Sequence, residues 1–149
     1  MLIPTKILVP TDFSEYSDKA LEQALDIAKQ YHAKVFLLHV MHDDMYRPTE
    51  TDFIVPEELR QKATDHHRAE TEERLRNQLR KFPQVKEVNV VTNIRKGVPY
   101  HEILEEGKEK NIDLIVIASL GRTGIAKYLI GGVARNVLRG SKCPVLLTK

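Results

Sequence analysis

The residues best suited to chemistry lie in the last third of the chain, where glycines follow an apolar run. The run 114–118 leads into a loop with Gly121 and Gly124, and nine residues separate Gly121 from the pair Gly131 and Gly132. A short helical pattern, 133–139, begins after that pair. Glycine lets the backbone approach a phosphate closely, and a helix N-terminus adds partial positive charge. This order of features predicts an anion site, and a nucleotide is the first ligand to consider.

A second candidate loop, 10–14, follows the first apolar run of the chain. If it lies beside the glycine loop, Asp12 could accept a hydrogen bond from an amine or a ribose hydroxyl. Arg122 and Arg135 could add charge, because a guanidinium matches phosphate oxygens in pairs. Two plainer interpretations stay open: Asp12 or Ser14 caps the following helix, and the glycines of the loop serve only a turn. The chain lacks the Walker lysine and the G-x-G-x-x-G pattern.

Apolar runs alternate with helical patterns along the chain, which is typical of an α/β domain with a mainly parallel sheet. We expect strands at 7–9, reaching residue 10, and at 34–40, 85–94, 114–118 and 145–147, and helices at 17–31, 56–82, 100–111 and 133–139. Residues 43–56 are predicted to form an irregular loop, and much of the charged helix after it should face water. Right-handed crossovers favour a doubly wound sandwich, in which ligands bind beyond the carboxyl ends of the strands.

Length and composition describe an ordinary globular protein. The 149 residues suit a single domain, 1–149, and the net charge of +2 gives no reason to expect nucleic acid or an anionic membrane as partner. The single cysteine, Cys143, excludes an internal disulfide and a cysteine-rich zinc site, and we expect an inert thiol. The apolar runs are too short to span a bilayer, and the N-terminus lacks the layout of a signal peptide. We therefore expect a cytoplasmic protein.

Histidines raise the question of a metal. His66 and His67 are adjacent on a charged helix, so they point in different directions and should be solvated. A second group follows the strand 34–40 and could hold a cation: His39, His42, Asp43 and Asp44. Its spacing matches no closed zinc pattern, so no metal site is predicted. The G-x-S-x-G elbow of a serine nucleophile is absent, and no pair of carboxylates suggests a hydrolytic dyad, so no catalytic residue is predicted.

Three segments, 6–14, 37–40 and 118–149, resemble the universal stress protein family, and the resemblance extends over essentially the whole chain. The tail is the most specific part, with its G-R-T-G loop, Gly131, and the run C-P-V-L-L at 143–147. The resemblance implies one doubly wound domain, with a five-stranded parallel sheet in the order 3-2-1-4-5 and helices on both faces. It also implies a homodimer in which the last strands pair edge to edge, and an apolar edge strand does need a cover. The pairing residues would be Val145, Leu146, Leu147 and Thr148.

The nucleotide-binding branch of that family carries Gly, two residues, Gly, nine residues, Gly, and then Ser or Thr. The corresponding positions here are Ala118, Gly121, Gly131 and Gly132, so two match and two depart. Alanine is small, and its steric effect is modest if its φ is negative. Gly132 keeps a backbone N–H but lacks a hydroxyl, and a hydrogen bond to a charged group contributes roughly 1.5–3 kcal/mol.

The resemblance implies that the ligand is ATP or another adenine nucleotide, with or without Mg²⁺. Pro10, Thr11 and Asp12 would lie at the adenine and ribose end, with Val40 as an apolar wall. The phosphate end would comprise Ala118, Ser119, Gly121, Arg122, Gly124, Gly131, Gly132 and Val133. The implied role is that of a stress-linked regulatory homodimer with an unidentified protein partner. Two alternatives stay open: an interaction module of the same fold that binds no nucleotide, and a slow ATP hydrolase.

Overall fold

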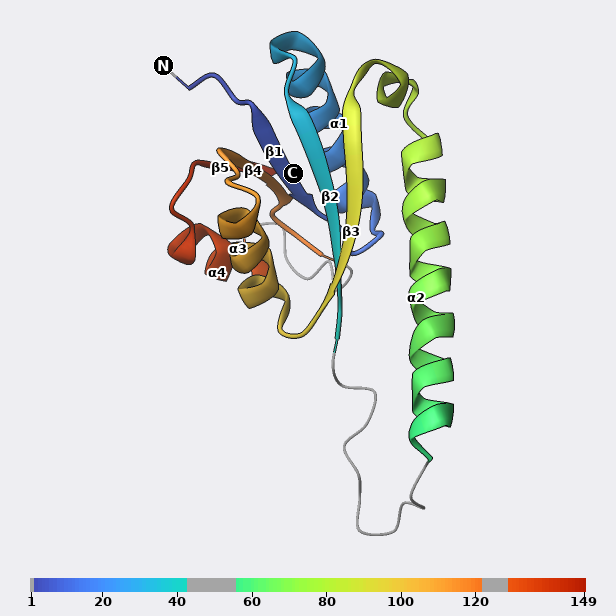
Figure 1. Cartoon of the computed structure of the whole chain (residues 1–149). Helices are drawn as coiled ribbons and strands as arrows, with labels where there is room; N and C mark the ends of the chain where they lie inside the picture. The colour runs from blue at the N-terminus through green and yellow to red at the C-terminus, as the bar shows by residue number, and fades with distance from the viewer. Residues whose placement is uncertain (1, 43–55, 122–128) are drawn as a thin grey trace.

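The computed structural model describes residues 2–42, 56–121 and 129–149 of the chain. Strands and helices alternate along the described residues, with one short 3₁₀ helix, η1, before the third strand (Figure 1). The elements are β1 Lys6–Pro10, α1 Glu15–Tyr31, β2 Lys34–Met41, α2 Glu57–Arg80, η1 Pro83–Glu87, β3 Asn89–Lys96, α3 Pro99–Glu109, β4 Leu114–Ala118, α4 Gly132–Gly140 and β5 Val145–Thr148.

The strands form one parallel sheet in the order β3-β2-β1-β4-β5. In the centre of the sheet, Ile7 of β1 lies opposite Val35 of β2 on one side and Leu114 of β4 on the other. The predicted fold class, a doubly wound α/β sheet in the order 3-2-1-4-5, is confirmed. The strand order reverses direction between β1 and β4, which is the place where such folds bind ligands.

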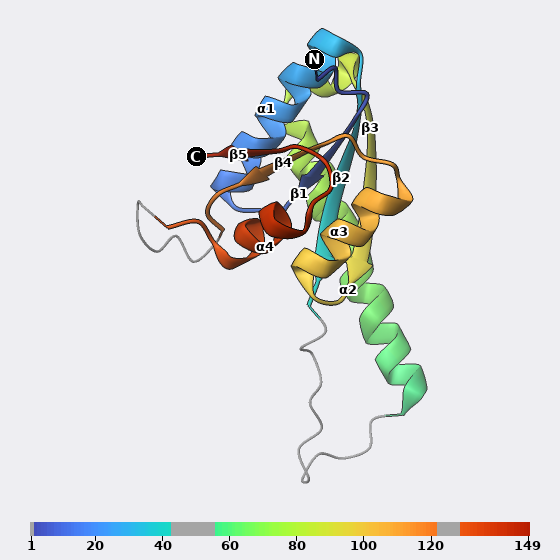
Figure 2. The ribbon, with the colours of Figure 1, turned by 90° about the vertical axis from the view of Figure 1, so that its left-hand side faces the viewer.

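Two apolar layers cover the two faces of the sheet, because successive side chains of a strand point to opposite sides. Val9 and Leu37 belong to the core beneath α1 and α2, whereas Leu8 and Leu38 pack with side chains of α3 and α4. Figure 2 shows α3 and α4 together on one face, with α1 behind the sheet. The strands are therefore buried on both sides, as expected for a covered parallel sheet.

Helix α1 begins at Glu15, two residues earlier than predicted. Ser14 is its N-cap, and the Ser14 hydroxyl accepts a hydrogen bond from the N–H of Ser17 at 3.2 Å. Such a cap satisfies one of the N–H groups that a helix leaves without an acceptor at its start. One stripe of α1 is buried against the sheet: Ala20, Leu21, Ala24, Leu25 and Ala28.

Helix α2 is much more exposed than α1. Among its 24 residues only Thr71, Leu75 and Gln78 are buried. Its first turns extend past the carboxyl ends of the strands, as Figure 1 shows. The expectation that much of this helix faces water is confirmed, and the buried positions all lie in its second half.

The third strand starts later than predicted, at Asn89 instead of residue 85. Residues Pro83–Glu87 form η1, with the proline in its first turn, where a missing N–H does no harm. Val85 and Val88 both pack against the core beneath α1, and they are three residues apart, which is one turn of a 3₁₀ helix. Their three-residue spacing therefore fits a 3₁₀ turn and not a strand, in which residues two apart share a face.

Other differences are small. Helix α2 begins at Glu57 and ends at Arg80, α3 begins at Pro99, and α4 begins at Gly132. The predicted loop at 43–56 lies outside the described residues, apart from Pro56, which is the N-cap of α2. Along the described ranges, no helix combines the length and the apolar character needed to cross a bilayer.

Candidate functional site

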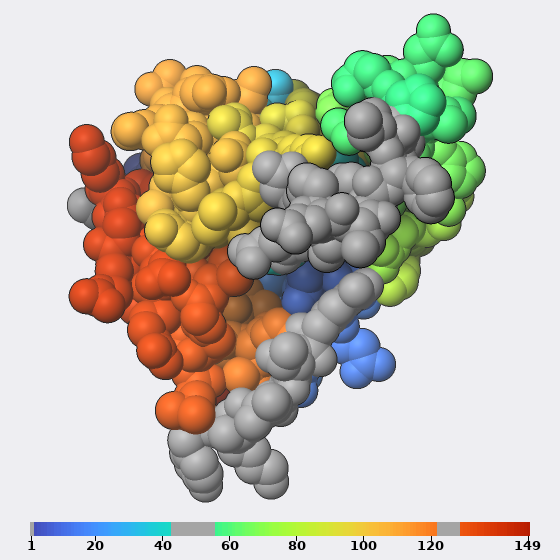
Figure 3. All heavy atoms as spheres, turned by 90° about the horizontal axis from the view of Figure 1, so that it is seen from below, coloured from blue at the N-terminus to red at the C-terminus, as the bar shows by residue number. Residues whose placement is uncertain are grey.

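A cavity of about 520 Å³ opens at the carboxyl ends of β1, β2 and β4. This volume lies in the range of small-molecule sites. Figure 3 views the molecule from this end, with α3 and α4 on one side and α2 on the other. The predicted site residues that line it are Pro10, Thr11, Asp12, Val40, Ala118, Ser119, Gly121, Gly131, Gly132 and Val133. The other two, Arg122 and Gly124, lie outside the described residues.

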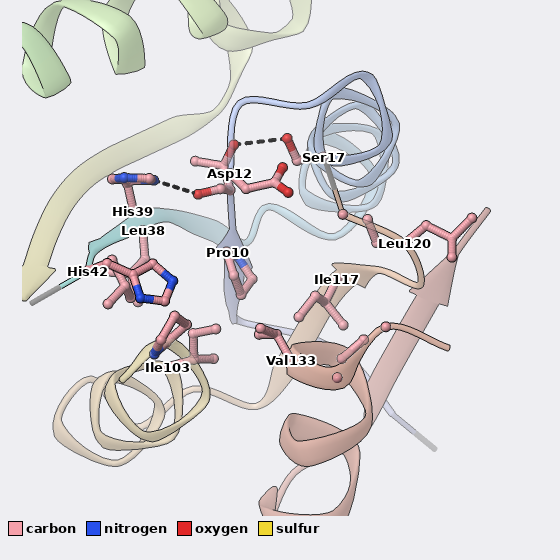
Figure 4. Close-up of a pocket in the computed structure, with 18 of the residues that line it drawn as sticks. Pro10, Asp12, Ser17, Leu38, His39, His42, Ile103, Ile117, Leu120 and Val133 are labelled. Atoms are coloured by element: carbon pink, nitrogen blue, oxygen red, sulfur yellow. Dashed lines mark hydrogen bonds between the residues drawn. The ribbon is translucent and has the colours of Figure 1, made fainter. Parts of the chain in front are cut away.

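The Thr11 hydroxyl is bonded within the protein. The Thr11 oxygen lies 2.9 Å from Oε1 of Gln78 and 3.0 Å from Oγ of Ser17, and it accepts the N–H of Phe13 at 3.0 Å. All three partners belong to the α1 and α2 side of the sheet or to the turn itself. The Thr11 carbonyl contacts Nδ1 of His39 at 2.8 Å, a bond drawn in Figure 4. Because a carbonyl only accepts, Nδ1 of His39 carries the proton.

Asp12 lies where the two predicted loops meet. Its Oδ1 accepts the N–H of Ser14 at 3.0 Å, while Ser14 caps α1. Its Oδ2 faces Gly121 closely, because a Cβ added to Gly121 would lie 2.9 Å from that oxygen. Figure 4 shows Asp12 between His39 and Leu120. The structure thus decides the open question of the cap in favour of Ser14 and places the Asp12 carboxylate at the cavity.

The glycine side of the cavity is built from backbone. The N–H of Gly131 donates to the carbonyl of Ser119 at 2.7 Å, which brings the two ends of the 119–131 segment together. Gly131 is the N-cap of α4, and a Cβ there would lie 3.3 Å from the same carbonyl oxygen. The first N–H groups of a helix have no acceptor within the helix, so those of Gly132 and Val133 face the region where the helix dipole favours an anion. Gly131 therefore allows close approach, and the residues after it supply the donors.

The two departures from the family motif have different physical consequences. Ala118 ends β4 and is not among the residues with positive φ, which in the described ranges are Phe13, His32 and Asn111 besides glycine. Alanine there causes no backbone strain. Among the described residues outside the first turn of α4, none has an atom within 4 Å of a Cβ added to Gly132, so these residues leave room for the missing serine or threonine side chain.

Apolar side chains form the remaining wall. Val40 of β2 is buried, and it belongs to the core cluster that includes Ile103 of α3 and Ile117 of β4. All three line the cavity together with Pro99. A planar, mostly apolar group such as a purine base fits a wall of this kind better than a charged group does.

Helix α2 contributes residues to the cavity that the sequence analysis did not name as site residues. Arg74 and His67 line the cavity from the face of α2 that also carries the buried Thr71. The Arg74 guanidinium carbon lies 4.2 Å from the centre of the Phe13 ring, and that ring lies 4.6 Å from the ring of His39. Phe13 has a φ of 64°, which is uncommon for a bulky residue. Positions 67, 71, 74 and 78 recur at helical spacing and therefore share one face of α2. That spacing could have indicated a buried face, but the residues at these positions are polar, so the pattern did not stand out.

The other histidines and the cysteine have ordinary surroundings. His66 is exposed on α2, 3.6 Å from Glu70, and His67, at the rim of the cavity, lies 3.9 Å from the same carboxylate. Within residues 2–42, 56–121 and 129–149, no three His, Cys, Asp or Glu side chains gather as they do around a metal ion. Asp43 and Asp44 lie outside these ranges. Cys143 is half-buried, with its sulfur 3.4 Å from the hydroxyl of Ser141.

Comparisons with known proteins agree with this architecture. Residues 4–149 match the model of the universal stress protein family. The universal stress protein MJ0531 of Methanocaldococcus jannaschii is 34% identical over 146 residues, covering 97% of this chain and 81% of the relative. The solved structure of MJ0577 is 28% identical with a TM-score of 0.82, covering 99% of this chain and 97% of that one. A universal stress protein solved in complex with cAMP is 25% identical with a TM-score of 0.69, covering 99% and 98%. This chain belongs to the universal stress protein family.

Proposed function

We propose that this protein binds an adenine nucleotide, ATP in the first instance, and acts as a regulatory homodimer in a stress response. The observation that carries the proposal is the meeting of Asp12, Gly121 and the N-terminus of α4 around one cavity. The related protein solved with cAMP supports an adenine nucleotide as the ligand class.

The phosphates bind between Gly121 and the first turn of α4, where the backbone N–H groups of Gly132 and Val133 face them. The ribose lies beside Asp12, whose carboxylate accepts a hydrogen bond from a ribose hydroxyl. The base packs against the apolar wall formed by Val40 and Ile117. Mg²⁺ accompanies the phosphates, since this ion is usually held by substrate phosphates together with one or two carboxylates.

A calorimetric titration of the nucleotide-free protein with ATP and Mg²⁺ tests this assignment. Saturable binding at one site per subunit, in the micromolar range, is the expected result. A folded protein that produces no binding heat up to millimolar ATP contradicts it. That outcome favours the second candidate, an interaction module without a nucleotide, for which the missing hydroxyl at Gly132 is the supporting observation.

The homodimer is assigned to β5, an edge strand that pairs only with β4 in the sheet of the described chain. Leu146 in its middle is 38% exposed, and a second copy of β5 would cover it. The substitution Leu146→Lys is expected to yield a folded monomer in sedimentation analysis. Val91 provides a matched control, because it lies on the opposite edge strand, β3, with the same 38% exposure, so Val91→Lys should leave the dimer intact.

A further inference from the structure

The cavity continues past the proposed nucleotide site toward α2, and we propose that Arg74 forms a second anion subsite there. The preferred ligand is then a nucleotide with phosphate groups at two separate positions. This inference rests on the proposed function, because it takes the first phosphate to lie on the glycine side.

The sheet order separates the two ends of the cavity. Ala118 ends β4 and Gly121 follows it, whereas His39 lies in β2, and β1 runs between these two strands. Neighbouring strands lie about 4.8 Å apart, so the ends are roughly 10 Å apart along the sheet. Arg74 lies beyond β2, on the helix that covers this side, yet it lines the same cavity as the glycines. One ligand can therefore reach both ends.

Arg74 is an exposed residue, and one face of its guanidinium lies over an aromatic ring. The guanidinium carbon lies 4.2 Å from the centre of the Phe13 ring, whose other neighbour is His39 at 4.6 Å. His39 is in turn bonded to the carbonyl of Thr11. Because the ring covers a face of the guanidinium, the N–H groups along its edge stay available, and such an edge binds two phosphate oxygens at once.

Charge pairing along α2 sets Arg74 apart from its neighbours. Arg68 lies 3.6 Å from Glu72, and Arg76 lies 2.6 Å from Glu73. For Arg74, by contrast, no carboxylate of residues 2–42, 56–121 or 129–149 comes within the 4.0 Å of a salt bridge. In the described lining of the cavity the carboxylate is Asp12, beside the glycine loop. The α2 end thus presents a guanidinium whose positive charge suits an anion from the ligand.

The geometry favours a second phosphate on the ribose. With the 5′-phosphate on the glycine side and the ribose beside Asp12, a phosphate on the 2′ or the 3′ oxygen points away from α4. The 2′-phosphate and the 3′-phosphate offer Arg74 the same group, a dianion that the ribose ring separates from the 5′-phosphate. Adenosine 3′,5′-bisphosphate and adenosine 2′,5′-bisphosphate are therefore the probes, and AMP is the reference that lacks the second group.

Calorimetry with these three compounds tests the proposal on the wild-type protein, Arg74→Gln and Arg76→Gln. The wild type should bind one of the bisphosphates at least about 10-fold more tightly than AMP, as expected for a charged hydrogen-bonded pair. Arg74→Gln should lose this preference while its affinity for AMP stays within about twofold, since AMP reaches only the glycine side. Arg76→Gln removes the same charge from an exposed position of the same helix and should behave as the wild type does.

Four results would overturn the proposal, and they differ in what they say about the nucleotide site. If the wild type binds AMP and both bisphosphates equally, or if Arg74→Gln keeps the preference, the second subsite is wrong and the nucleotide site stands. An equal loss of AMP and bisphosphate binding in Arg74→Gln means that Arg74 supports the cavity and does not select a phosphate. If none of the compounds binds to the folded wild type, the proposed nucleotide function fails as well.

Discussion

The two loops that meet in the cavity are built in opposite ways. In the turn between β1 and α1, the side chains are already bonded within the protein: Thr11 to Gln78, and Asp12 to the N–H of Ser14. On the side between β4 and α4, the cavity is lined by backbone, and the glycines leave room beside it. The β1–α1 turn is therefore held by bonds between its own side chains and the protein, whereas the β4–α4 side leaves room beside its backbone N–H groups.

This contrast separates stability from binding. Substitutions in the β1–α1 turn should change the free energy of unfolding, because they remove partners of buried polar groups. Substitutions of the glycines should change ligand affinity with little effect on folding, because Gly131 and Gly132 form the start of a short peripheral helix. Variants in the two loops can therefore show whether the free energy of unfolding and the ligand affinity change independently.

Gly131→Val should produce the largest effect. A Cβ at this position already lies 3.3 Å from the carbonyl of Ser119, so the added methyl groups would occupy the space in front of the loop. We expect the affinity for ATP to fall by about 100-fold or more, which corresponds to roughly 2.7 kcal/mol. Calorimetric titration measures this loss, and circular dichroism checks that the fold is retained.

Gly107→Val is the matched control. Gly107 lies in α3 outside the cavity, and a Cβ there meets no atom within 4 Å among the described residues beyond its own helix turn. It should bind ATP with the affinity of the wild type. If Gly131→Val also binds ATP normally, the phosphates do not lie against this loop and the contrast between the two sides is wrong.

Thr11→Val tests the other loop. The substitution keeps the shape of a buried side chain but removes the oxygen that contacts Gln78 and accepts the N–H of Phe13. Leaving buried polar groups without partners costs about 1–3 kcal/mol, so we expect chemical denaturation to show a loss of that size.

The affinity for ATP should fall less in Thr11→Val than in Gly131→Val. Thr92→Val makes the same atomic change at an exposed position of β3 and should leave stability nearly unchanged. Equal stability of Thr11→Val and the wild type would mean that the hydroxyl network does not hold the turn.

The fold was largely predictable because its signals are local. The alternation of apolar runs with amphipathic helices such as α1 follows from residue types alone. The order of the strands, which the structure confirms, came from the family resemblance and not from this pattern. The predicted start of β3 at residue 85 was wrong because Val85 and Val88 suit a 3₁₀ turn as well as a strand. Periodicity over so few residues cannot separate the two.

The glycine side of the site was predictable for a similar reason, since glycines and a helix start mark it in the sequence. The contact that each glycine makes could not be predicted in the same way. Only the folded chain reveals that the N–H of Gly131 bonds to Ser119. The contribution of α2 depends on packing between Phe13 and Arg74, which are 61 positions apart, and the spacing of residues on one face of the helix does not reveal that contact by itself.

Gly132→Ser tests the β4–α4 side by adding a hydroxyl where the wild type offers only backbone N–H groups. Outside the first turn of α4, no atom of residues 2–42, 56–121 or 129–149 lies within 4 Å of a Cβ at this position, so the serine displaces none of them. Its hydroxyl can donate to a phosphate, and a hydrogen bond to a charged group raises affinity by about 10-fold at the lower end of its usual range. Titration with ATP should therefore show tighter binding, with the free energy of unfolding changed little.

Gly132→Ala isolates the hydroxyl in that experiment, because it adds the same Cβ without the oxygen. It should bind ATP as the wild type does, and the difference between the serine and alanine variants then measures the hydrogen bond alone. If both variants gain equally, the effect comes from a more rigid first turn of α4, since glycine is the most flexible residue at any helix position. If neither gains, the phosphates lie beyond reach of this helix, and the donors on the backbone side must be sought at Gly121.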